Sequence, residues 1–226
     1  MKIMPIAAIL NHAFQFVIQT SEKYHIDESH GLKHSMDVLH LANKIYNHEL
    51  ETRPFLINQK EIIFTACILH DMCDSKYNLE IDGLVEINKH MKTHMSEENL
   101  KIVSQIISTM SYSKVKKNGF PDLQEYQLAY HIVREADLLS AYDIDRCIIY
   151  GMMVEKYDYS HALRRAKDLM RTRVLNYRSD NLFITNYSKI LSLKMHVKSV
   201  YDLEKLDFIH STFEKGGAKD CVNRDL

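Results

Sequence analysis

Apolar residues recur along most of the chain at intervals of three and four positions, the period of an amphipathic α-helix. The pattern predicts helices at about 5–24, 29–50, 59–75, 96–112, 123–155 and 158–176, with more helix between 181 and 213. The helix at 123–155 is expected to break near Ser140. Six glycines and three prolines are too few for the turns of a fold made of short strands. We therefore expect an all-α fold, a helical bundle.

The turn-forming residues fall between predicted helices and do not divide the chain into domains. Gly83 is expected to mark a loop after the third helix, and the run of Lys114, Lys116 and Lys117 is expected to lie in a flexible loop. No repeat or low-complexity tract interrupts the helical pattern. The pattern thus predicts a single all-helical domain over residues 1–213 and a flexible, polar tail over residues 214–226.

Charge and composition narrow the class of protein. Thirty acidic and 29 basic side chains leave a net charge of -1, so no global positive field favours duplex nucleic acid as a partner. The four cysteines show no CxxC spacing and are expected to be reduced thiols of a cytoplasmic protein. Polar residues such as Asn11 and His12 interrupt the first apolar run, which is too polar for a signal peptide or a membrane span. We expect no membrane association.

Several polar side chains occupy helix positions that the apolar pattern assigns to the core. In the second predicted helix, His34 lies on the same face as Val38. The third predicted helix is very apolar and carries the dipeptide His70-Asp71 near its end. In the fifth, Asp137 stands where the helical period calls for an apolar residue. Three separate helices thus direct imidazole or carboxylate groups inward.

Buried carboxylates need a compensating positive group. Without one, each costs several kcal/mol, a large part of the roughly 5–15 kcal/mol that stabilises a domain. A divalent cation would compensate, with His34, His70, Asp71 and Asp137 as its ligands. Mixed nitrogen and oxygen ligands with open positions favour one Mn, Co, Ni, Fe or Mg ion over a closed structural zinc site. Taken singly, His34 could be a hydrogen-bonded core residue, and Asp137 could be a buried partner of Arg134.

The order His34, His70-Asp71 and Asp137 resembles the HD-domain superfamily of metal-dependent phosphohydrolases, which is named after this dipeptide. Residues 29–38 resemble the family's first-histidine helix, and residues 66–71 resemble its apolar helix that ends in His-Asp. Residues 135–141 resemble its Ala-Asp-x-Leu segment, with Leu138 where the family often has arginine. The resemblance covers about residues 25–155, and more loosely the C-terminal helices of small stand-alone HD hydrolases.

The resemblance implies an HD-domain helical bundle with a central metal site. Its core would span about residues 25–155, and the C-terminal helices residues 158–213. It implies that His34, His70, Asp71 and Asp137 hold the metal, and that the reaction is hydrolysis of a phosphate ester or anhydride. Dinuclear relatives add two histidines before the last aspartate. His90 or His94 matches one of them, but the position of the other, near residues 107–111, contains no histidine, which favours one ion.

Further residues are candidates for catalysis and substrate binding. Asp74 resembles the acidic residue that follows the His-Asp pair in HD enzymes acting on guanosine pyrophosphate derivatives, and it is the candidate base for the attacking water. Lys76, like the lysine after this pair in many relatives, is a candidate for catalysis and for phosphate binding. His30, one turn before the first ligand, could orient the substrate. Arg171 and Arg173 lie in a basic stretch and are candidate phosphate-binding residues.

The expected partner is a small-molecule phosphate compound, and the resemblance favours a nucleotide. Whether phosphate or pyrophosphate is released stays open, as do the identity of the metal and the oligomeric state. One rival hypothesis is a non-catalytic HD module that binds a nucleotide or a protein. A second, weaker rival is a di-iron HD oxygenase. Metal content and hydrolysis of a phosphate panel separate the three.

Overall fold

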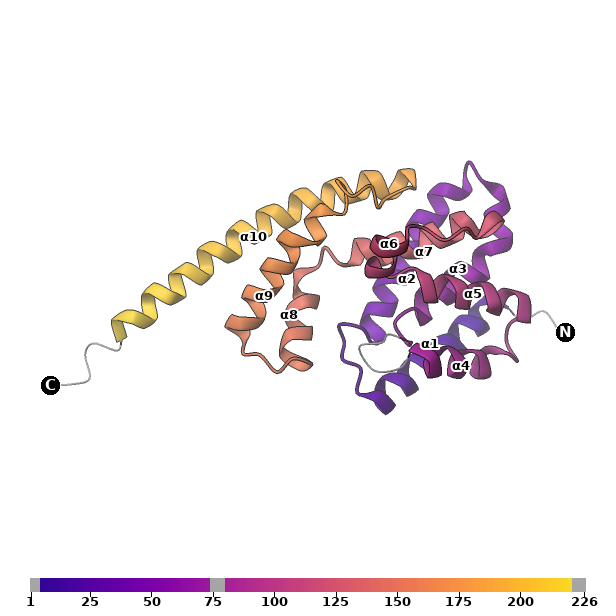
Figure 1. Ribbon diagram of the computed structural model, residues 1–226, viewed down its shortest axis with the longest axis horizontal. Helices are drawn as coiled ribbons and strands as arrows, with labels where there is room; N and C mark the ends of the chain where they lie inside the picture. Colours follow the sequence, from indigo (N-terminus) through magenta and orange to yellow (C-terminus); the bar gives the residue numbers. More distant parts are fainter. Residues whose placement is uncertain (1–4, 74–79, 221–226) are drawn as a thin grey trace.

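The described part of the chain folds into helices, as the period of its apolar residues predicts. The computed structural model describes residues 5–73 and 80–220, and every regular element in these residues is a helix (Figure 1). The predicted all-α fold is therefore confirmed. The α-helices are α1 (Ile6–Tyr24), α2 (Leu32–Leu50), α3 (Lys60–Leu69), α4 (Glu80–Met91), α5 (Glu97–Thr109), α6 (Tyr112–Asn118), α7 (Gln127–Ser140), α8 (Ile144–Met153), α9 (Tyr159–Thr172) and α10 (Asn186–Asp220). Short 3-10 helices are η1 (Pro54–Gln59), η3 (Gln124–Tyr126) and η4 (Val174–Asn176).

Helix α3 is the buried centre of the fold. Every side chain from Ile62 to Leu69 is buried, and α1, α2, α5 and α7 all contact this helix. A helix that is apolar on every face is stable when other elements enclose it. The helix ends at Leu69, earlier than the predicted range of 59–75, so His70 and Asp71 lie in the turn that follows it. Packing around α3 therefore places this dipeptide among the surrounding helices.

The predicted break near Ser140 is confirmed. Helix α7 ends at Ser140, and α8 starts four residues later at Ile144. The side chain of Asp143 accepts a hydrogen bond from the backbone N–H of Asp145 at 3.1 Å and caps the new helix. The chain thus changes direction directly after the segment that carries Asp137.

Helices α8 and α9 form a hairpin with a small core of its own, built around Ile148 and Leu163. Gly151 allows the two helices to approach closely, because a Cβ atom at this position would lie 3.0 Å from the Cβ atom of Ala162. In Figure 1 the hairpin lies beside the long helix α10, apart from the helices that surround α3. The residues between α7 and α8 connect the hairpin to the larger core.

Two buried carboxylates hold the chain at the start of α10. Glu49 of α2 is 1% exposed, and its Oε1 atom accepts a hydrogen bond from the backbone N–H of Asn186 at 3.1 Å. Glu135 of α7 accepts hydrogen bonds from the backbone N–H of Ile184 and from the hydroxyl of Thr185, both at 2.6 Å. Negative charge is favourable at a helix N-terminus. These contacts attach α10 to the two helices that carry His34 and Asp137.

One predicted loop is a helix. Gly83 lies inside α4, so the prediction of a loop at this residue is wrong. Ile87 and Met91 are fully buried and continue one apolar face of α4 at helical spacing. The glycine serves packing: a Cβ atom at Gly83 would lie 2.7 Å from the carbonyl oxygen of Met72. Helix α4 therefore packs directly on the turn that follows α3.

The lysine run predicted to be a flexible loop is also helical. Ser111 caps α6, and its hydroxyl oxygen accepts a hydrogen bond from the backbone N–H of Lys114. Lys116 forms an ion pair with Asp180 at 3.0 Å. The prediction is wrong because a capping serine and packing against the core outweigh the charge of the run. At the other end, α10 continues past residue 213, where a tail was expected, to Asp220. No helix within residues 5–73 and 80–220 is long and apolar enough to cross a bilayer.

Candidate metal centre

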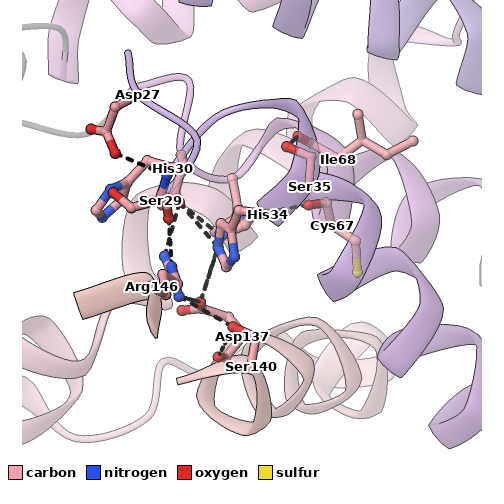
Figure 2. Close-up of polar contacts among 12 residues, drawn as sticks. Asp27, Ser29, His30, His34, Ser35, Cys67, Ile68, Asp137, Ser140 and Arg146 are labelled. Atoms are coloured by element: carbon pink, nitrogen blue, oxygen red, sulfur yellow. Dashed lines mark hydrogen bonds and ion pairs between the residues drawn. The ribbon is translucent and has the colours of Figure 1, made fainter. Parts of the chain in front are cut away.

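Side chains from three helical segments meet in one cluster. The Nε2 atoms of His34 and His70 are 3.0 Å apart. The Oδ1 atom of Asp137 lies 3.5 Å from the first of these nitrogens and 3.7 Å from the second. All three atoms lie within 4.8 Å of one another, and Figure 2 shows His34 and Asp137 directed toward each other. Ligands bound at about 2.1 Å, at the angles of tetrahedral or octahedral sites, stand roughly 3–3.5 Å apart. The spacing therefore fits one cation.

Asp71 completes the predicted set. Its Oδ2 atom lies 3.2 Å from the Nε2 atom of His34 and 3.4 Å from that of His70. The structure thus brings together all four residues that the sequence analysis selected. Two imidazoles and two carboxylates are a donor set that suits a divalent ion with open positions.

The helices position these side chains through packing. Val38, one turn after His34 in α2, is fully buried, so the histidine points inward with it. The hydroxyl of Ser35 donates a hydrogen bond at 3.0 Å to the carbonyl oxygen of Ile68, near the end of α3 (Figure 2). This contact joins α2 to the segment that carries His70. Asp137 comes from α7, which packs against both α2 and α3.

The ring of His70 is oriented to present a nitrogen lone pair to the cluster. Nδ1 of His70 lies 2.8 Å from the carbonyl oxygen of Cys67. A carbonyl only accepts, so Nδ1 carries the proton and, in the neutral ring, Nε2 presents a lone pair to the cluster. The Nδ1 atom of His34 is buried and has no hydrogen-bond partner among the described residues. A carbonyl that fixes the second nitrogen is typical of metal-binding histidines.

Electrostatics favour a positive charge at the cluster. Burial disfavours the charged form of His70, but Asp71 and Asp137 outweigh burial and raise the pKa of this imidazole to about 10. Burial also opposes ionisation of the two carboxyls, but the neighbouring imidazoles outweigh it and hold the pKa of both well below the usual range. In the ion-free protein a proton on His70 therefore balances part of the negative charge. A bound cation would take over this role.

Sulfur is poorly suited to join this cluster. Cys67 lies one helical turn before His70 and is fully buried. Burial, together with the charge of Asp137, raises the pKa of its thiol well above the usual value. Since the thiolate is the form that binds metals, the thiol of Cys67 is a weak ligand.

Arg146 of α8 also contacts the cluster, although no pattern in the sequence predicted this contact. Its guanidinium lies 3.4 Å from Oδ2 of Asp71 and 3.5 Å from Oδ1 of Asp137. It also donates to the carbonyl oxygen of Ser29 and to the hydroxyl of Ser140, as Figure 2 shows. Arg146 therefore holds both carboxylates from the side of the α8–α9 hairpin. No helical spacing relates it to the ligands, because the break between α7 and α8 intervenes.

The candidate catalytic residues differ in what the structure describes. The ring of His30 lies 6.2 Å from that of His34 and 5.4 Å from that of Tyr150, between centroids. Its Nδ1 atom is 2.7 Å from the hydroxyl of Ser29. His30 is therefore a buried neighbour of the cluster. Asp74 and Lys76 lie outside the described residues.

The two candidate phosphate-binding arginines lie in different places. A cavity of about 190 Å³ adjoins the cluster, and Arg173 lines it together with His70, Asp71 and Asp137. Arg171 instead forms an exposed ion pair with Asp207 of α10 and does not line this cavity. The structure thus does not bring Arg171 to this cavity. This side chain stays on the outer face of α9, where α10 supplies its partner.

The histidines considered for a second metal lie elsewhere. The ring of His94 stacks on that of His12 of α1 at 3.6 Å between centroids. His90 packs against Phe16 of the same helix, and its Nε2 atom donates to the carbonyl oxygen of His12. Within the described residues, His34, His70 and Asp137 are the only group with a spacing suited to a metal. His90 and His94 therefore support the packing of α4 on α1.

Comparison of the chain with protein-family models, curated proteins and solved structures found no match. What the cluster can do chemically therefore follows from its own residues. Those residues supply four donor atoms of metal-binding type, a guanidinium that holds the acidic ones, and a cavity beside them with a second guanidinium.

Proposed function

We propose that this protein is a metal-dependent phosphohydrolase of the HD-domain type that cleaves a phosphate ester or anhydride. The observation that carries the proposal is that His34, His70, Asp71 and Asp137 converge beside a cavity that Arg173 also lines. A divalent ion held there would lower the pKa of water and polarise a phosphoryl oxygen. Side chains that can bind a cation and an arginine that can bind an anion thus border the same cavity.

The protein's own residues support such a reaction in distinct ways. The carbonyl of Cys67 fixes the ring of His70, so one donor is oriented before any ion binds. Arg146 holds the two carboxylates and limits their motion. Arg173 adds positive charge where an anionic substrate would enter. His30 can orient groups at the edge of the cluster, and Asp74 remains the proposed proton acceptor.

The proposed substrate is a small phosphate compound in the cytoplasm, with a nucleotide as the first class to test. Arg173 supports an anionic substrate, because guanidinium groups match the geometry of phosphate oxygens. Lys76 is proposed as a second phosphate contact on the strength of the family resemblance. One ion per chain is proposed, since the described residues place His90 and His94 against α1.

The test combines metal analysis with a substrate panel. Protein stripped by a chelator is reloaded with Mn, Co, Ni, Fe or Mg and incubated with nucleotides and simple phosphate esters. We expect one retained ion per chain and release of product with at least one metal. Asp71→Asn should lose both, whereas Asp37→Asn, which removes an exposed carboxylate from α2, should lose neither. Retention of two irons, or no product with any metal, would contradict the proposal.

A further inference from the structure

Two chemically different groups of side chains line the cavity beside the candidate metal centre. His70, Asp71 and Asp137 belong to the ligand cluster. Tyr112 of α6 and Arg173, at the end of α9, line the same cavity. A molecule in this cavity would touch the ligand cluster and the guanidinium together.

Arg173 is held in place by aromatic side chains. Its guanidinium carbon lies 4.3 Å from the centroid of the Tyr112 ring, in a cation–π contact. Its Nε–H donates a hydrogen bond at 3.1 Å to the hydroxyl of Tyr177. The Tyr177 side chain is 1% exposed and packs against Tyr112 at 5.3 Å between centroids. The guanidinium is therefore fixed before a ligand arrives.

Arg173 forms no ion pair with the residues that the structure describes. Among the described residues it has no carboxylate partner, and its two Nη groups donate no hydrogen bond to protein. Two arginines of α9 differ in this respect: Arg165 pairs with Glu155, and Arg171 pairs with Asp207. A fixed guanidinium with two free donor groups is a preformed site for an anion with two adjacent oxygens, such as a phosphate group.

The size of the cavity limits how much of a substrate can enter. Its volume is about 190 Å³. Sites that enclose a whole drug-sized ligand measure about 300–1,000 Å³. The cavity is smaller than such sites, so it can hold one phosphate group but cannot enclose a whole nucleotide. The remainder of the substrate must stay outside.

We infer that the site accepts the terminal phosphate of a phosphomonoester, seats two of its oxygens on Arg173, and releases orthophosphate rather than pyrophosphate. This inference rests on the proposed hydrolase function and deepens it. In the reaction, water oxygen forms a bond to phosphorus, and the bond from phosphorus to the ester oxygen breaks. One water proton passes to the released alcohol, and the other stays on the orthophosphate.

Calorimetric titration with inorganic phosphate tests phosphate binding at Arg173 independently of turnover. We expect Arg173→Gln to weaken phosphate binding to the metal-loaded protein by about one to two orders of magnitude, while retaining one ion per chain. Arg173→Lys, which keeps the charge but loses the planar pair of donors, should weaken binding by a smaller factor. Arg171→Gln is the matched control and should bind as the wild type. Circular dichroism checks that each variant is folded.

Product analysis completes the test. A nucleoside monophosphate should yield orthophosphate and nucleoside, and a nucleoside triphosphate should yield no pyrophosphate. Pyrophosphate as product, or phosphate binding that is unchanged in Arg173→Gln, overturns this inference and leaves the proposed hydrolase in place. Absence of hydrolysis with every metal overturns the proposed function, and the inference falls with it.

Discussion

The Nε2 atoms of His34 and His70 face each other at 3.0 Å, although 36 positions separate the two residues in the chain. The other ring nitrogen of His70, Nδ1, donates a hydrogen bond to the carbonyl oxygen of Cys67. Two imidazole nitrogens at this distance, beside two carboxylates, need a positive group to be stable. In the ion-free protein a proton on His70 supplies this charge, and the proposed metal ion would replace it.

Metal binding should therefore release a proton. In the ion-free protein, burial lowers the pKa of His70, but Asp71 and Asp137 outweigh burial and raise this pKa to about 10. The imidazole is therefore protonated at neutral pH. Loading should release about one proton per ion, and the apparent affinity should rise as the pH approaches 10. Calorimetry in buffers of different ionisation enthalpy measures the number released. A pH-independent affinity between 6 and 9 would contradict the assignment.

The same group makes a prediction about the stability of the ion-free protein. A raised pKa means that the folded state holds the His70 proton more tightly than the unfolded state does. Its contribution is complete below about pH 6.5 and is lost as the pH rises toward 10. Urea unfolding should thus show stability falling over this interval in wild type and falling less in His70→Gln. If stability fell equally with pH in the two proteins, the raised pKa of His70 would be contradicted.

Arg146→Gln should weaken the metal site without unfolding the protein. The change removes the guanidinium that contacts Asp71 and Asp137, so both carboxylates gain freedom and lose a positive neighbour. Residues that orient ligands typically contribute about 10- to 100-fold to metal affinity, and we expect a loss in that range. Competition with a metal chelator measures it. Arg164→Gln, an exposed change on α9, is the control and should leave the affinity unchanged.

His131 of α7 makes the fold sensitive to acid. Burial, followed by the charge of Arg134, lowers the pKa of this imidazole to about 4. The unfolded chain binds a proton near pH 6.5 and the folded protein does not, so stability falls between pH 6.5 and 4, by on the order of 3 kcal/mol. His131→Gln should flatten this fall in urea unfolding curves. An identical acid profile in the variant would show that another group is responsible.

Gly83→Ala should destabilise the protein through a direct clash. The added Cβ atom would lie 2.7 Å from the carbonyl oxygen of Met72, so α4 must move away from the turn that follows α3. Overpacking of this kind costs about 1–3 kcal/mol, which urea unfolding resolves. Val85→Ala changes an exposed residue of the same helix and should cost far less. A variant as stable as wild type would mean that α4 tolerates the shift.

The sequence predicts which polar side chains point inward because that prediction uses local information. The period of α2 and α7 sets the faces of His34 and Asp137, and the apolar run before His70 predicts its burial. The all-α fold follows in the same way from period and from the scarcity of turn formers. Contacts between distant segments carry no such signature, and for that reason Arg146 was missed.

The choice between Arg171 and Arg173 shows the same limit on a smaller scale. The two residues are two positions apart in one basic stretch, and charge alone does not distinguish them. Helix α9 ends at Thr172, so the chain leaves the helical path at Arg173 and turns this side chain toward Tyr112, while Arg171 keeps the outer face. The prediction of a loop at Gly83 was wrong for a related reason. It serves a close contact with Met72, which only the packed structure reveals.

X-ray absorption spectroscopy of the cobalt-loaded protein addresses the metal centre most directly. We predict one ion per chain, surrounded only by nitrogen and oxygen at about 2.1 Å, with the scattering pattern of two imidazoles. The pattern should fall to one imidazole in His34→Ala. Sulfur neighbours, which Cys67 or Cys73 would supply, or a spectrum that is unchanged in His34→Ala, would contradict the account.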